Sequence, residues 1–272
     1  MNTKLIISFF VLLITIGSYA QTKGSGNVKS EDRNTGNFTG IKLTCSADLY
    51  ITQGATSVTV KADDNLLQFI ETEVENGVLN IGVKGRGFRS AKILEVHISV
   101  PNLEKILNSG SGDIKFKNVY KTNDLYINLS GSGDLNGDFN ATNLELKVNG
   151  SGDTGLSGVM GMFKISVSGS GDVDAEGLKL EECYVKNSGS GDISLEGKAN
   201  TLTISQNGSG DIDAYNLTAV NVTVSNSGSS DISLNVVEKL QVTLNGSGDV
   251  TYRGEPGKVD VRSNGSGEVY KR

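Results

Sequence analysis

The sequence predicts an all-β fold: a single-stranded right-handed parallel β-helix (solenoid) with about 19–20 residues per coil. A Ser/Asn-Gly-Ser-Gly-Asp motif recurs nine times, at intervals of 18 to 21 residues. Apolar and polar residues alternate on both sides of each motif, which is the period of strands and not of helices. Glycine is abundant at 35 residues, and its concentration in the motif indicates an ordered repeat rather than disorder. The acids that end the motifs are Asp113, Asp134, Asp153, Asp172, Asp192, Asp211, Asp231, Asp249 and Glu268.

Aligned on these acids, the repeats define columns of equivalent positions. The residue seven positions before the acid is always aliphatic, and the residue after it is aliphatic in every repeat except that of Thr154. The column nine positions before the acid is apolar except for Glu104. Each strand therefore stacks on its equivalent in the next coil, about 4.8 Å away, and the columns form a narrow continuous core. The variable spacing argues against left-handed hexapeptide repeats, and right-handed crossovers are the general preference.

The motif itself predicts a tight turn. Glycine permits a positive φ, and Asp or Ser side chains accept backbone N–H groups at turns. Charged acids stacked about 5 Å apart repel one another, so each is either partly neutralised by turn amides or binds a cation. Calcium needs six to eight oxygens, and one Asp and one Ser per turn supply few. We therefore predict a capping role, with no metal site and no cofactor.

A further column, five positions before the acid, carries amides in three consecutive repeats: Asn187, Gln206 and Asn226. Stacked amides hydrogen-bond to one another along an axis of stacked strands. We expect an internal polar ladder that is structural and has no reactive role.

The residues before the repeats predict export. Residues 1–20 have the pattern of a signal peptide, with Lys4, an apolar run and a small-x-small cleavage site at 18–20. The run is too short for a transmembrane helix, and no later segment has the length to span a membrane. The expected location is the periplasm, the outer-membrane surface or the extracellular space.

Between the signal peptide and the repeats, two further segments differ in pattern. Residues 21–35 are polar and predict a flexible segment. Residues 36–107 lack the motif but alternate like strands, so we expect irregular opening coils that cover one end of the solenoid. The β-helix domain then spans 36–270, with the repeats at 108–270.

Charge and cysteine content narrow the classes further. The net charge of −6 makes nucleic acid a poor partner for an exported protein. Export permits a disulfide between Cys45 and Cys183. Because Cys183 falls in an inward column, two separate buried thiols are the expected state.

No catalytic constellation is visible in the sequence. His97 is the only histidine, it lies in a strand among apolar residues, and no nucleophile elbow accompanies it. Coil length varies by only three residues, so no loop walls a cleft within the repeats. We therefore predict a non-catalytic binding or structural protein of the cell envelope. The alternative is a polysaccharide lyase or hydrolase, since carboxylate pairs such as Asp172 and Asp174 recur.

One outward face is the candidate ligand surface. It lies on the strands that precede the turns. The later coils carry hydroxyl side chains there, and the earlier coils carry lysines and aromatic rings. Exposed threonines also suit strands in general, and lysines protect sheets from aggregation. Solenoids nevertheless bind through such elongated faces, and we predict a polysaccharide or a cell-surface protein as the partner. The candidate residues are Thr203, Ser205, Thr223, Ser225, Tyr126 and Tyr184, beside Lys147, Lys164 and Lys186.

Several segments before the repeats carry a family resemblance. Residues 38–41 (Phe-Thr-Gly-Ile), 48–54, 58–66 and 96–101, together with the Ser-Gly-Ser-Gly-Asp repeats, resemble the exported "putative auto-transporter adhesin, head GIN domain" proteins common in Bacteroidetes. The likeness covers roughly residues 36–270. It implies a right-handed β-helix and an adhesive or carbohydrate-related role, and it brings no established catalytic residues.

Overall fold

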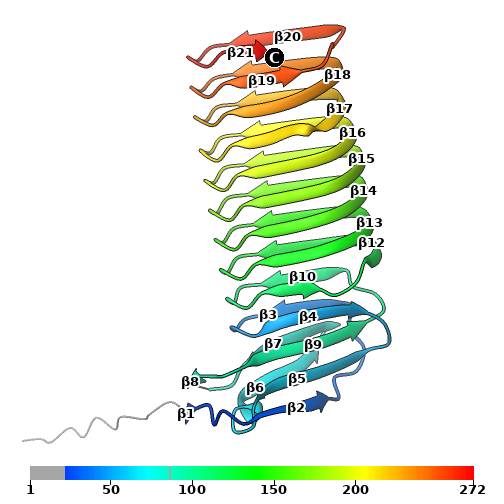
Figure 1. Cartoon of the computed structure of the whole chain (residues 1–272), viewed down its shortest axis with the longest axis vertical. Helices are drawn as coiled ribbons and strands as arrows, with labels where there is room; N and C mark the ends of the chain where they lie inside the picture. Colours follow the sequence, from blue (N-terminus) through cyan, green and yellow to red (C-terminus); the bar gives the residue numbers. More distant parts are fainter. Residues whose placement is uncertain (1–21, 86) are drawn as a thin grey trace, which may run out of the picture.

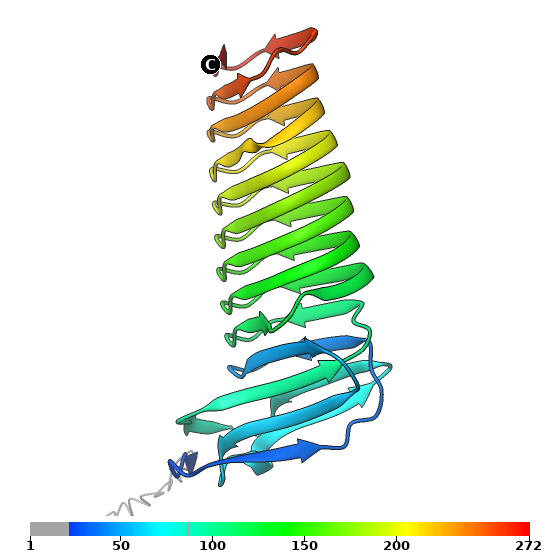
Figure 2. The same ribbon diagram turned by 45° about the vertical axis from the view of Figure 1, so that its right-hand side comes forward.

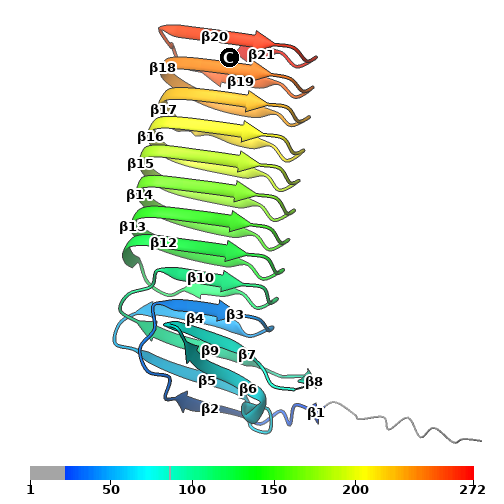
Figure 3. The same ribbon diagram turned by 180° about the vertical axis from the view of Figure 1, so that it is seen from behind.

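The computed structural model describes residues 22–85 and 87–272, so the predicted signal peptide at 1–20 lies outside the described residues. The described chain is all-β except for one 3-10 turn at Leu67–Phe69. Its coils stack into one tall parallel solenoid (Figure 1). Followed from the blue to the red end in Figures 1 and 3, the coils wind right-handed. The predicted fold class is confirmed.

The strands of the repeat region run from one glycine turn to the next. They are β10 (Lys105–Asn108), β11 (Ile114–Phe116), β12 (Tyr120–Leu129), β13 (Leu135–Val148), β14 (Thr154–Val167), β15 (Val173–Asn187), β16 (Ile193–Gln206), β17 (Ile212–Asn226), β18 (Ile232–Leu244), β19 (Val250–Arg253), β20 (Lys258–Ser263) and β21 (Val269–Lys271). From β13 to β18 the two strands expected per coil join into one strand that bends opposite the glycine turn (Figure 2). We call its two parts the post-turn half and the pre-turn half.

The predicted inward columns form the core. Ile127, Leu146, Ile165 and Val185 are parallel register partners in successive coils, and each is at most 2% exposed. Burying such an aliphatic side chain contributes roughly 1.5–3 kcal/mol. The small side chains match a core only two sheets thick, which explains why the chain has few aromatic residues.

The motif glycines are needed for a different reason from the one predicted. None of the motif glycines has a positive φ. Instead, the turns of successive coils lie backbone against backbone. A Cβ on Gly150 or Gly169 would fall below 3.0 Å from the carbonyl oxygen of the equivalent glycine one coil below. Any side chain at these positions would therefore push the coils apart.

The motif acids form a ladder along the solenoid axis. The backbone N–H of each acid donates to Oδ1 of the acid one coil below, at 2.7–3.1 Å, in nine consecutive steps from Asp48 to Glu268. Turn amides thus bond to the carboxylates, as the first of the two predicted alternatives requires. Each carboxylate takes the place of a backbone carbonyl at the corner where the regular sheet pattern breaks.

The predicted hydrogen bonding between stacked amides along the solenoid axis is wrong. Asn187 and Asn226 are buried as expected, but each clamps its own turn. In both, Oδ1 accepts the N–H two residues on, and Nδ2 donates to the carbonyl four residues on. Gln206 donates likewise to Gly210. Short polar side chains often bond to backbone groups of their own turn, and these amides do so here. One contact, from Asn187 to the carbonyl of Gly210, crosses between coils.

The N-terminal part closes one end of the stack. Its strands are β1 (Thr22–Lys23), β2 (Val28–Arg33), β3 (Gly40–Leu43), β4 (Asp48–Gln53), β5 (Ser57–Asp63), β6 (Ile70–Glu75), β7 (Val78–Val83), β8 (Phe88–Ser90) and β9 (Leu94–Val100). The β3/β4 coil pairs with β10 and β11 on one side and with β7 and β9 on the other, always in parallel. The chain therefore leaves this coil, descends to the end of the stack and returns before β10.

Antiparallel strands complete this end, and they differ from the expected coils. β5 pairs antiparallel with β9, β2 with β5, and β6 with β7. Residues 28–33, within the segment predicted to be flexible, thus form an edge strand across the bottom of the stack (Figure 2). The cause is the exposed edge of the last sheet, whose N–H and C=O groups take up a further strand.

A buried carboxylate ties this end together. The side chain of Asp63 is fully buried. Its oxygens accept the backbone N–H groups of Lys92, at 2.7 Å, and of Gly26. These hydrogen bonds, of which the one from Lys92 has the largest effect, hold the pKa of the Asp63 carboxyl below its ordinary value of 3.8.

The two cysteines are separate thiols, as expected. Cys183 is buried in the core, and burial raises its pKa to about 12. Cys45 lies in the turn of the β3/β4 coil and is half-buried, so only one of the two thiols is fully in the core.

Gly169→Ala tests the backbone contact between turns. The added Cβ meets the carbonyl of Gly150, so we expect a loss of about 3 kcal/mol in the free energy of unfolding, measured by urea denaturation. Ser170→Ala, at the exposed neighbouring position, is the control and should change the free energy by less than about 0.5 kcal/mol. Equal stability of the two variants would contradict the close stacking.

Asp63→Asn tests the buried carboxylate. Because the folded pKa is lowered, the carboxylate stabilises the fold fully above the ordinary pKa, and this stabilisation is lost as the pH falls through the folded pKa. The wild type should melt above the variant at pH 7, and the gap should shrink below about pH 4. Asp174→Asn, an exposed site, should leave the melting temperature unchanged. A gap that stays constant with pH would refute the assignment.

Candidate ligand-binding face and groove

The predicted ligand residues share one surface, the pre-turn face. We define it as the outward residues eight and six positions before each motif acid. Thr203 and Thr223 are register partners in β16 and β17, as are Ser205 and Ser225. Tyr184, which lies in the coil below, is the register partner of Thr203. The structure therefore brings these five residues together in one continuous patch.

Tyr126 lies on the same face but apart from that patch. It belongs to β12, and Glu145 and Lys164 separate it from Tyr184 along the column. Its ring is flanked by lysine ammonium groups from the coils on both sides, with Lys105 Nζ at 5.9 Å and Lys147 Nζ at 5.1 Å from the ring centroid. The hydrogen bond and charge of Glu145 raise the pKa of Lys147, which keeps that cation charged.

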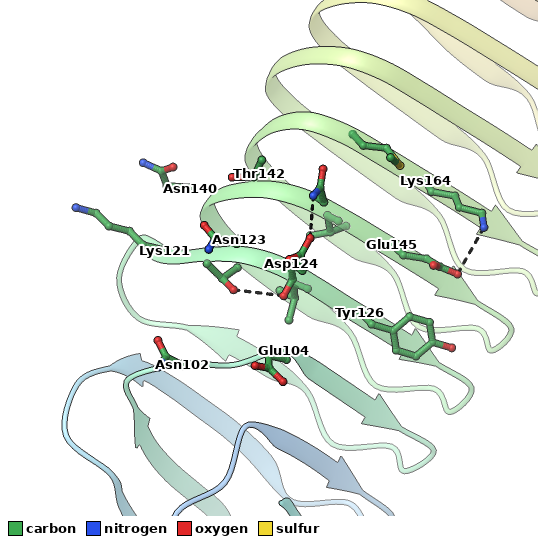
Figure 4. A pocket seen from close by; sticks show the side chains of 15 residues that line it. Asn102, Glu104, Lys121, Asn123, Asp124, Tyr126, Asn140, Thr142, Glu145 and Lys164 are labelled. Carbon is green, nitrogen blue, oxygen red and sulfur yellow. Dashed lines mark hydrogen bonds and ion pairs between the residues drawn. The ribbon is translucent and has the colours of Figure 1, made fainter.

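A groove of about 930 Å³ adjoins Tyr126 (Figure 4). Strand β10 has only four residues, and it pairs with β12 only from Tyr126 to Leu129. The first half of β12 therefore overhangs the loop that leads into β10, which leaves the groove open. The lining side chains include Asn102, Glu104, Lys121, Asn123, Asp124, Tyr126, Asn140, Thr142, Asn143, Glu145 and Lys164.

The chemistry of the groove is that of hydrogen bonding to hydroxyl groups. Amides and carboxylates dominate its lining, and each presents donors or acceptors in a plane. Asn143 donates to Oδ1 of Asp124 at 2.8 Å (Figure 4). Glu145 pairs with Lys147 at 3.0 Å and with Lys164 at 3.9 Å. Tyr126 and the exposed Met162 supply apolar surface.

Most of these groove residues were not predicted, although one signal pointed to them. Glu104 is the exception in an otherwise apolar column. In the structure it is exposed and lines the groove instead of the core. Asn102, Asn123 and Asp124 carry no signal in the sequence, because they face one another only after the loop into β10 has folded.

His97 lies on β9 as the register partner of Tyr50 on β4, away from the pre-turn face. Their rings stack at 4.9 Å, and His97 Nε2 lies 3.0 Å from Oε2 of Glu95. Lys61 reaches the same carboxylate oxygen at 3.2 Å. Burial disfavours the Glu95 carboxylate, but the bonds from His97 and Lys61 outweigh it and lower its pKa.

Neither a cluster of metal-ligand side chains nor a membrane-spanning helix occurs in the part of the chain that the structure describes. No group of three or more His, Cys, Asp or Glu side chains gathers there as a metal site. No helix there has the length and apolarity needed to cross a membrane.

Residues 37–195 and 181–256 match the model of a family described as "Putative auto-transporter adhesin, head GIN domain". The chain belongs to this family. An adhesin acts outside the cytoplasm, so membership implies an exported or cell-surface location. No curated protein matches the sequence significantly.

Solved structures share the fold. A protein from Parabacteroides distasonis titled "putative lipid binding protein" is 24% identical, with a TM-score of 0.66 over 92% of this chain and 98% of that one. A "putative adhesin" from Parabacteroides merdae is 22% identical, with a TM-score of 0.67 over 93% and 100%. A "putative adhesin" from Parabacteroides distasonis is 22% identical, with a TM-score of 0.60 over 92% and 98%. At these identities the likeness concerns the fold alone.

Proposed function

We propose that this head GIN domain protein is an exported, non-catalytic binding protein of the cell envelope that holds a polysaccharide along its pre-turn face. The observation that carries the proposal is the groove beside Tyr126, where amides, carboxylates and an aromatic ring converge. Sugar hydroxyls need such planar donors and acceptors, and sugar rings need an apolar surface such as the Tyr126 ring.

The rest of the pre-turn face supports an extended ligand. Beyond the groove, the column continues through Lys164 and Tyr184 to Thr203 and Thr223 without a bulge. A polysaccharide chain that lies along the solenoid axis meets one set of side chains per coil. Each contact is weak, and the affinity comes from their sum.

A polysaccharide-cleaving enzyme is the second candidate. The observation in its favour is that the groove brings Glu104, Asp124 and Glu145 to one place. Release of new reducing ends from a bound polysaccharide, lost in Asp124→Asn and Glu145→Gln, would support that candidate and overturn the non-catalytic proposal.

A glycan array probed with residues 21–272 tests the proposal. On the best glycan, Tyr126→Ala should weaken binding about tenfold, the worth of one aromatic contact. Single alanine changes at Thr203, Ser205, Thr223 or Ser225 should do little, whereas the pair Thr203→Glu and Thr223→Glu should block the face without changing the melt.

The control pair is Ser194→Glu and Ser233→Glu, which adds the same charge to the opposite broad face. It should leave binding unchanged. If both pairs are silent and deletions within residues 36–100 destroy binding, the pre-turn face is not the site.

A further inference from the structure

The two broad faces of the solenoid carry opposite charge. We define the post-turn face as the outward residues two and four positions after each motif acid. From the coil of Asp134 to that of Asp211, its exposed charges are all carboxylates. They are Asp138, Asp174, Glu176, Glu196 and Asp213. In the coil of Asp113, the same positions hold Lys115 and Lys117.

The pre-turn face is basic over coils that largely overlap with these. From the coil of Asp113 to that of Asp192, its two columns hold four lysines against the single carboxylate of Glu145. The lysines are Lys105, Lys147, Lys164 and Lys186. The protein as a whole has a net charge of −6, so this concentration of cations is local.

The basic groups follow a regular pattern along the axis. Lys147 and Lys186 stand in one column with Ser166 between them, two coils or roughly 10 Å apart. Lys164 occupies the neighbouring column on the intermediate coil. The ammonium groups therefore form a zigzag, as required to meet charges that recur along an extended polymer.

Two tyrosine rings bracket this zigzag. Tyr126 lies at the end near the groove, with lysines over its ring. Tyr184 lies at the other end, is 40% exposed, and has its hydroxyl held by Oε2 of Glu182 at 2.9 Å. Rings that flank cations suit a ligand with both apolar sugar faces and anionic groups.

We propose that the polysaccharide held on the pre-turn face is anionic, with carboxylate or sulfate groups that pair with Lys147, Lys164 and Lys186 between the two tyrosines. This inference rests on the proposed function and names its ligand class. The carboxylates of the post-turn face, from the coil of Asp134 to that of Asp211, repel the same polymer, so over these coils only the pre-turn face takes it up.

Dextran sulfate and dextran test the inference, because they share a backbone and differ in charge, and polygalacturonate supplies carboxylates in place of sulfates. The protein should bind dextran sulfate or polygalacturonate, whichever matches its anion, at least about tenfold more tightly than dextran at about 50 mM salt. This preference should fall steeply as salt is raised.

The decisive variant pair changes charge equally on the two faces. The double variant Lys147→Gln, Lys186→Gln should lose about tenfold or more in affinity and show a weaker salt dependence. The control Lys115→Gln, Lys117→Gln removes the same charge from the post-turn face and should stay within about twofold of the wild type. Both should melt like the wild type, since exposed charges contribute little to stability.

Each other outcome overturns the inference in a distinct way. If dextran binds as tightly as dextran sulfate and the double variant Lys147→Gln, Lys186→Gln has no effect, the ligand is not anionic, but the proposed function still holds. Single-stranded DNA bound as tightly as the polysaccharides would replace it with unspecific polyanion binding. No binding to any glycan of the array or to these three polymers would remove the proposed function itself.

Discussion

The contact between the backbones of successive glycine turns governs the rest of this structure. Where Gly150 lies over Gly131, and Gly169 over Gly150, no space remains for a Cβ. This contact sets how closely successive coils approach one another at the turn. Because the corner is fixed, the strands that leave it start in register, and the aliphatic columns, the acid ladder and the outward columns follow.

The same regularity explains where a binding site can arise. Within the repeats, most outward positions have an equivalent above and below, which gives faces that are largely flat. A smaller hollow of about 510 Å³ lies on the post-turn face around Gly137 and Gly155, where side chains are missing. The groove of about 930 Å³ beside Tyr126 lies where the repetition breaks, because β10 follows the inserted N-terminal strands. The flat pre-turn face then continues the surface available to a ligand beyond the groove.

The features of the fold that could be predicted from the sequence are those that repeat in every coil. The core columns, the parallel stacking and the shared face of Tyr184, Thr203 and Thr223 were predictable because nine repeats give the same answer. The coil of Asp48 escaped detection, since Cys45 and Ala47 stand where later turns have glycine. Ile41 seven positions before Asp48 and Leu49 after it were the signal available.

Features that depend on long-range return of the chain were not predictable. Nothing local to residues 54–102 indicates that they leave the stack and return to place β10 on β3. The groove depends on that return. The reason for the motif glycines was also misjudged, because a tight turn suggests positive φ, whereas the space taken by the neighbouring coil is visible only in three dimensions.

The in-register stack is tested most directly by a distance along its axis. Nitroxide labels on Ser132→Cys and Ser247→Cys, with Cys45→Ser and Cys183→Ala to remove the native thiols, sit on exposed turn positions six coils apart. At about 4.8 Å per coil, pulsed electron paramagnetic resonance should give one narrow peak near roughly 29 Å. A broad distribution, or a peak displaced by more than the rise of one coil, would contradict the regular stacking on which the columns and both faces depend.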